Sequence, residues 1–111
     1  MAERTYLGEL ELMILLSVVG LGDEAYGVPV AREIEKHLGR EVSLGSVYAA
    51  LERLAARGLV ASKLGDSTPE RGGKAKRYFR VTKAGLRQMQ ETRRVLQEMW
   101  RSLPTLRGER A

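Results

Sequence analysis

The side chains most suited to chemistry form a basic cluster in the second half of the chain. Five arginine and lysine residues occur with no acid between them: Arg71, Lys74, Lys76, Arg77 and Arg80. The adjacent Gly72 and Gly73 let this segment bend toward a charged surface. Each basic group that neutralises a phosphate releases counterions, so the pattern is typical of salt-dependent phosphate binding. A loop that is merely solvated is the alternative.

A second candidate site lies on residues 43–57, where spacing predicts a helix with Leu51 on its apolar face. Ser43 is placed to cap the start of this helix. At about 100° per residue, the positions opposite Leu51 are Gly45, Ser46, Ala49, Arg53 and Ala56. Small residues there permit close approach to base edges, and the forked guanidinium of Arg53 can donate to guanine or to phosphate. An ordinary solvated face, with Arg53 paired to a carboxylate, is the alternative.

Tyr48 lies near the start of the same predicted helix. Its phenol can donate to a phosphate, or it can cover the edge of the core. Both interpretations stay open from the sequence.

The sequence gives little support for a catalytic site or a metal site. The chain has no cysteine, which excludes disulfides and thiolate metal sites. The only histidine, His37, falls at the charged end of a short helix, where an exposed side chain is expected rather than a catalytic one. The sequence predicts no enzyme, no cofactor and no metal.

Acidic pairs and glycine spacing do not change that conclusion. The acidic pairs Glu9 with Glu11 and Glu33 with Glu35 are two residues apart, so each splays to different helix faces and is predicted to be surface charge. Residues 20–25 formally match a dinucleotide fingerprint. However, acids would face the pyrophosphate there and no βαβ unit follows.

Charge is distributed unevenly along the chain. Residues 1–42 hold four basic and eight acidic side chains, whereas residues 43–111 hold fifteen basic and six acidic ones. A basic region of this extent predicts a polyanionic partner. Double-stranded DNA, an acidic protein and RNA all fit that description, although the aromatic residues lack the paired arrangement of a base-stacking RNA platform.

Apolar periodicity predicts three helices followed by a hairpin. The stretch from Leu7 to Val19 is too apolar for a single stripe, so we interpret it as a helix between its own core and a second subunit. A central helix in a monomer is the alternative. Gly20, Gly22 and Asp23 are predicted to end this helix. A second helix follows Tyr26 and Gly27 and ends at Gly39, with Pro29 in its first turn.

The C-terminal part has two further patterns. Residues 59–64 and 77–81 are typical of two short strands, and residues 83–103 of a helix with an apolar seam of Leu86, Met89, Leu96, Trp100 and Leu103. Pro104 ends that helix. The predicted fold class is mainly α with a small β-hairpin: a winged helix-turn-helix over residues 1–82, a C-terminal dimerisation helix over 83–103, and a disordered tail over 104–111.

Cellular location can also be predicted. The longest apolar stretch is about half the length of a membrane span, and acids flank it where a signal peptide carries basic residues. We expect a cytoplasmic protein that does not enter a membrane.

Three segments resemble the PadR family of transcriptional regulators. They are residues 45–60 (GSVYAALERLAARGLV), 25–27 (AYG) and 77–85 (RYFRVTKAG), and the resemblance covers roughly residues 5–103. It implies a winged-helix repressor of the compact subgroup, which dimerises through its C-terminal helix and binds two-fold symmetric operators. Carried over by position, the DNA contacts are Ser46, Tyr48, Lys74, Lys76 and Arg77. Pro29 departs mildly from the residues common in the family.

The resemblance also implies a ligand. Some members bind small planar apolar effectors at the dimer interface beside the C-terminal helix. Trp100, with Leu96 and Leu103, is the candidate that would stack on such a molecule. The alternative is that Trp100 is an aromatic residue of the dimer contact itself.

Together these patterns predict a homodimeric, sequence-specific DNA-binding repressor. The DNA-binding candidates are Ser43, Gly45, Ser46, Tyr48, Ala49, Arg53, Arg71, Lys74, Lys76 and Arg77. A basic module that binds an acidic protein is the alternative function.

Overall fold

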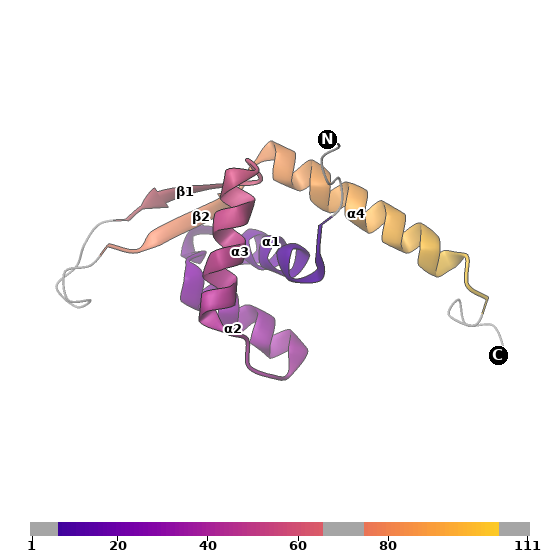
Figure 1. Cartoon of the computed structure of the whole chain (residues 1–111), viewed down its shortest axis with the longest axis horizontal. Coiled ribbons are helices and arrows are strands. Elements are labelled where there is room, and N and C mark those ends of the chain that lie inside the picture. The colour runs from indigo at the N-terminus through magenta and orange to yellow at the C-terminus, as the bar shows by residue number, and fades with distance from the viewer. Residues whose placement is uncertain (1–6, 66–74, 105–111) are drawn as a thin grey trace.

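The computed structural model describes residues 7–65 and 75–104, which are mainly helical with one hairpin (Figure 1). The elements in chain order are α1 (Glu9–Leu21), the 3-10 turn η1 (Gly22–Glu24), α2 (Gly27–Leu38), α3 (Leu44–Ala56), β1 (Val60–Leu64), β2 (Arg77–Val81) and α4 (Lys83–Arg101). The hairpin and the far part of α4 extend from opposite sides of the body formed by α1, α2 and α3. The predicted winged-helix order is confirmed.

Helix α1 lies at the centre of the molecule and contacts α2, α3 and β2. Ile14, Leu15 and Val18 are buried against them, while Leu16 and Val19 on the opposite side stay about half exposed. The helix passes through Gly20 to Leu21 and ends within the predicted segment, at Gly22. Gly22 has a φ of 58°, a positive value that glycine adopts readily.

Glu11 corrects another expectation, since it is buried rather than a surface charge. Its Oε1 accepts a hydrogen bond of 2.9 Å from the backbone N–H of Gly8 and lies 3.7 Å from Nη1 of Arg57. Glu11 therefore caps α1 and ties it to the residue that follows α3. The other predicted surface acid of this pair, Glu9, is exposed.

The hairpin joins the helical body through backbone contacts. Its strands are antiparallel, with Val60 opposite Val81 and Leu64 opposite Arg77. The backbone N–H of Phe79 donates to the carbonyl of Ala25 at 2.8 Å, so a backbone hydrogen bond ties β2 to the segment before α2. The Phe79 side chain is buried in the core. The base of the hairpin is thereby held in a defined position relative to α2.

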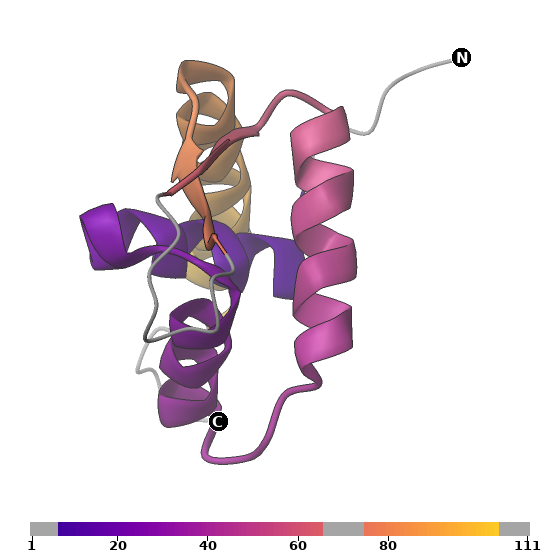
Figure 2. The same cartoon turned by 90° about the vertical axis from the view of Figure 1, so that its left-hand side faces the viewer.

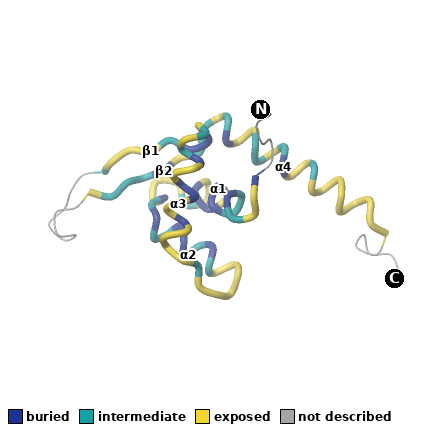
Figure 3. Tube along the Cα trace, in the orientation of Figure 1, coloured by how far each residue is buried: buried dark blue, intermediate teal, exposed yellow. Residues whose placement is uncertain are grey.

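Helix α4 begins in close contact with the hairpin. A Cβ on Gly85 would lie 2.2 Å from the carbonyl oxygen of Leu59, so only glycine fits there. Thr92 accepts a hydrogen bond of 3.2 Å from the backbone N–H of Leu7 and is buried. Beyond Thr92 the helix leaves the body and becomes exposed (Figure 3). None of the helices in residues 7–65 and 75–104 has the length and apolarity needed to span a membrane.

Candidate nucleic-acid interface

The predicted outward face of α3 is open to solvent. Figure 2 shows α3 standing along one edge of the body. The residues predicted to face outward are all exposed: Gly45, Ser46, Ala49, Arg53 and Ala56. Ser43 caps the helix as predicted, because its Oγ accepts a hydrogen bond of 3.2 Å from the backbone N–H of Ser46. This face combines small residues with one long cation.

Arg53 is the only basic side chain on that face. No ion pair links it to any other residue within 7–65 and 75–104. The alternative in which Arg53 pairs with a nearby carboxylate is therefore not what the described residues show. As far as the described residues go, its guanidinium is available to an external acceptor.

Tyr48 lies between α2 and α3. Its ring passes over Gly27, where an added Cβ would be 2.2 Å from the ring Cζ and 2.3 Å from the hydroxyl oxygen. The side chain nevertheless remains 41% exposed. Tyr48 thus covers the junction of the two helices and still presents a surface to solvent.

Lys76 lies at the end of the hairpin farthest from Val60 and Val81, where Tyr26 holds its side chain. Its Nζ donates a hydrogen bond of 2.6 Å to the hydroxyl of Tyr26 and lies 3.8 Å from the centre of that ring. The rings of Tyr26 and Tyr78 meet edge to face with centroids 5.4 Å apart. These contacts orient the Lys76 ammonium without neutralising its charge.

Arg77 is engaged differently, because an acid on α3 binds it. Its Nε donates to Oγ of Ser62 at 3.0 Å, and its Nη1 donates to Oε2 of Glu52. Its guanidinium carbon also lies 5.2 Å from the centre of the Phe79 ring. The structure thus gives Arg77 a carboxylate partner, which the absence of acids between residues 71 and 80 did not suggest.

Three basic residues of the cluster remain, and the structure describes only one of them. Arg71 and Lys74 lie outside the described residues. Arg80 is exposed and lies opposite Ala61 in the hairpin register. Because side chains alternate along a strand, Arg80 lies on the sheet face opposite Arg77 and Phe79.

Sequence reasoning missed Glu52 and did not assign contacts to Tyr26 and Gly27. Glu52 follows Tyr48 by four residues, so helical periodicity alone puts both on one side of α3. Tyr26 and Gly27 were noticed only as part of the segment 25–27. Their partners, Lys76 and Tyr48, come from other elements and cannot be read from local spacing.

The residues proposed for an effector lie at the far end of α4 and just beyond it, because the helix ends at Arg101 rather than at the predicted residue 103. Leu96, Trp100 and Leu103 are 44%, 57% and 45% exposed. Two surface hollows occur elsewhere, one between η1 and the hairpin around Asp23 and Tyr78, the other between α1 and α2 around Leu16. Leu96, Trp100 and Leu103 line neither of these two hollows.

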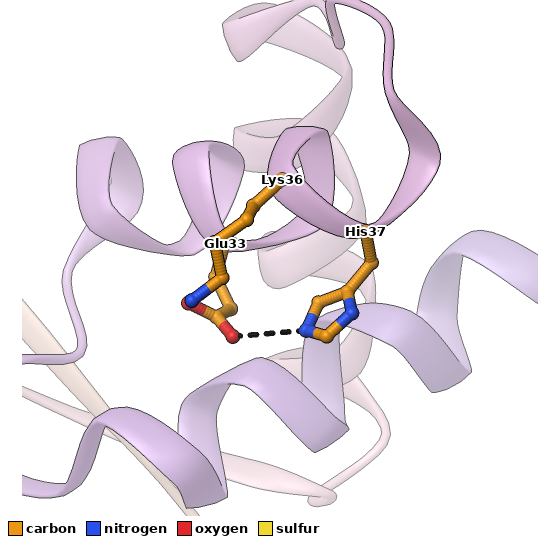
Figure 4. A network of polar contacts seen from close by, with 3 residues as sticks. All are labelled: Glu33, Lys36 and His37. Atoms are coloured by element: carbon orange, nitrogen blue, oxygen red, sulfur yellow. Dashed lines mark hydrogen bonds and ion pairs between the residues drawn. The ribbon is translucent and has the colours of Figure 1, made fainter.

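The only histidine takes part in a surface contact. His37 is exposed as predicted, and its Nε2 lies 3.1 Å from Oε2 of Glu33, while Nζ of Lys36 lies 3.4 Å from Oε1 (Figure 4). The contact with His37, and then that with Lys36, lower the pKa of the Glu33 carboxyl. The described residues contain no cluster of three acids or histidines able to hold a metal.

A comparison with protein families decides the classification. The sequence profile described as the transcriptional regulator PadR-like family matches residues 15–91, from α1 into α4. This chain belongs to the PadR family. Members of that family are transcriptional regulators, so the PadR chain is a transcriptional regulator and not an enzyme.

Individual relatives agree with that family. Transcriptional regulator Rv3488 of Mycobacterium tuberculosis is 36% identical over 83 residues, which cover 73% of this chain and 71% of the relative. A PadR-like transcriptional regulator from Bacillus cereus has a similar crystal structure, with a TM-score of 0.70, 28% identity, and coverage of 87% of this chain and 89% of that one. A PadR family regulator from Eggerthella lenta has a TM-score of 0.65, 27% identity, and coverage of 82% and 79%.

Proposed function

We propose that this PadR-family regulator is a homodimeric repressor that binds a two-fold symmetric DNA operator. The observation that carries the proposal is the exposed small-residue face of α3 beside a basic hairpin. A helix with such a face can enter the major groove, while a hairpin beside it reaches the flanking backbone. Occupancy of the operator would then block transcription.

The proposal assigns different roles to the two elements. Gly45, Ser46 and Ala49 let the helix approach the base edges, and Arg53 donates to a base. The phosphate contacts come from the hairpin and the flanks of α3: Ser43, Tyr48, Arg71, Lys74, Lys76 and Arg77. Such contacts position the protein on the duplex but carry little sequence information.

Dimerisation is proposed through the part of α4 that leaves the body. Leu96 and Trp100 on this part of α4, with Leu103 just beyond its end, are exposed, and none of the three belongs to the core formed by the described residues. The exposed Leu16 and Val19 of α1 are a second apolar surface that a partner subunit could cover. We propose a DNA-binding unit over residues 1–82, a dimerisation helix over 83–103 and a terminal tail over 104–111.

Two roles are proposed for Trp100, and a single titration separates them. In one, its indole only packs in the dimer contact; in the other, it also stacks on a small planar apolar effector that relieves repression. Adding planar aromatic compounds while following Trp100 fluorescence and operator affinity tests the second role. If both signals stay constant, Trp100 is a dimer contact alone.

The deciding experiment compares two DNA duplexes of equal length. One is the DNA upstream of the gene for this protein, and the other is the same DNA scrambled, each titrated over a series of salt concentrations. A repressor of its own gene binds the upstream duplex preferentially as a dimer. Equal, steeply salt-dependent binding to both duplexes contradicts local repression, and no binding to either favours the acidic-protein partner.

A further inference from the structure

Glu52 is an acid placed among the side chains assigned to DNA. It lies on α3 one turn after Tyr48, is exposed, and binds Arg77 of the hairpin. A carboxylate at such a position repels phosphate and also occupies a cation that would otherwise attract it. Its presence beside a DNA-binding surface therefore needs a reason.

The ion pair is exposed enough to exchange partners. The Arg77 and Glu52 side chains are 40% and 58% exposed, whereas Glu11 in the structural pair with Arg57 is only 6% exposed. Exposed ion pairs are weak because water screens both charges. A phosphate that is held close to Arg77 can therefore replace Glu52 as its partner. A phosphate that is not held there does not displace Glu52 for long enough to add to the binding free energy.

The hairpin geometry gives the pair a second effect. Arg77 also contacts Ser62 and the Phe79 ring within the hairpin, so its ion pair with Glu52 links the hairpin to the middle of α3. In the free protein, this link favours one position of the hairpin relative to α3, so the two elements are already arranged before DNA is bound.

We propose that Glu52 is a specificity determinant that withholds Arg77 from random DNA and releases it to phosphate only when α3 is seated in the operator. The inference rests on the proposed DNA-binding function. On scrambled DNA, α3 is not seated, so Arg77 stays on Glu52 and contributes no phosphate contact. On the operator, the seated helix brings a backbone phosphate close enough to compete with Glu52 for Arg77.

The substitution Glu52→Gln tests this proposal, because it keeps the size of the side chain but removes the charge. We expect binding to scrambled DNA to tighten roughly two- to fivefold at low salt, the range that follows from releasing an exposed ion pair. Its salt dependence should steepen by about 0.9 in the logarithmic slope, which corresponds to one added phosphate contact. Operator binding should gain less, so the ratio of the two affinities falls.

Glu33→Gln is the matched control. It makes the same change of charge and breaks another surface ion pair, that of Glu33 with Lys36 at 3.4 Å on α2, and neither residue is assigned to DNA or to the dimer contact. We expect it to leave the affinity ratio unchanged. If Glu52→Gln and Glu33→Gln alter scrambled-DNA binding and its salt slope equally, the proposal is wrong.

A double-mutant cycle with Arg77→Gln identifies the group released. The single variant Arg77→Gln should weaken operator binding and leave scrambled-DNA binding nearly constant. In the double variant, Glu52→Gln should no longer tighten binding to scrambled DNA. If Glu52→Gln still tightens it, Glu52 acts by repelling phosphate and Arg77 is not its target, which overturns the proposal. If the wild-type protein binds no DNA at all, the proposed function fails as well. That outcome differs from a failure of the Glu52 proposal alone, because then no variant would bind DNA either.

Discussion

The phenol of Tyr48 occupies the space that a side chain on Gly27 would need, with its Cζ 2.2 Å from the position of the missing Cβ. The first residue of α2 thus sets where an exposed aromatic side chain of α3 lies. The short segment from Ala25 to Gly27 contacts three residues of other elements. The Ala25 carbonyl accepts a hydrogen bond from the backbone of Phe79, the Tyr26 hydroxyl accepts one from Lys76, and the lack of a side chain on Gly27 leaves room for Tyr48.

Gly27→Ala should displace Tyr48 while leaving the fold intact. The clash involves the far end of a side chain that is 41% exposed and can move outward, so we expect the free energy of unfolding to change by no more than about 1 kcal/mol. If Tyr48 donates to a phosphate, operator affinity should fall about two- to tenfold, the worth of one hydrogen bond. Gly20→Ala is the control, because a Cβ there would meet no atom within 4 Å apart from its chain neighbours and the backbone of its own helix, and it should leave affinity constant. An unchanged operator affinity in Gly27→Ala would remove Tyr48 from the contacts.

Arg53→Ala should weaken operator binding by about 1–3 kcal/mol, because a bidentate contact to a base is lost. Binding to the scrambled duplex should fall less, since no base is recognised there. Titration of both duplexes with the same protein preparation measures the difference. Equal losses on the two duplexes would mean that Arg53 contacts phosphate and does not recognise a base.

Neutralising Lys74 and Lys76 to glutamine should reduce the salt dependence of DNA binding. Two lost phosphate contacts lower the logarithmic slope by about 1.8. The control replaces Arg94 and Arg101, which pair with Glu91 and Glu98 on α4, by glutamine and removes the same charge. If the hairpin and control variants show the same slope as each other, the hairpin does not touch phosphate.

Leu96→Glu combined with Leu103→Glu should separate the proposed dimer. Burying two carboxylates in an apolar contact is unfavourable, so sedimentation should show the mass of a monomer. Operator affinity should then fall roughly 100-fold, since each half-site must be bound independently. Leu38→Glu, which places the same charge at an exposed leucine at the end of α2, should leave the mass unchanged. A wild-type protein that is itself monomeric would contradict the proposed dimer directly.

Glu11→Gln should destabilise the protein by about 1–3 kcal/mol, because the charge opposite Arg57 disappears from a buried position. The glutamine oxygen can still accept the hydrogen bond from Gly8, so the helix cap is kept. Urea unfolding measures the loss. Glu9→Gln, exposed at the start of the same helix, should change the stability by less than about 0.5 kcal/mol. Similar values for the two variants would show that the Arg57 pair contributes nothing.

Local spacing was sufficient to predict the elements and one surface of the site. The helical spacing of Val47, Leu51 and Leu54 correctly predicts the buried side of α3, whereas Leu44, predicted on the same side, is 40% exposed at the start of the helix. The five residues predicted to lie opposite Leu51 are exposed. The two strands and the final helix were likewise predicted to within a few residues. These features depend on the repeat of the backbone, which nearby residues determine.

Only the tertiary structure decided which charges stay available. Arg77 meets Glu52 across 25 residues of sequence and Lys76 meets Tyr26 across 50, whereas Arg53 has no ion-pair partner among the described residues. Glu11 was predicted on the surface because its neighbours in sequence gave no sign of Arg57. The physical reason is that an ion pair depends on a few ångströms of separation between side chains from different elements, and that separation is set by how the helices and the hairpin pack.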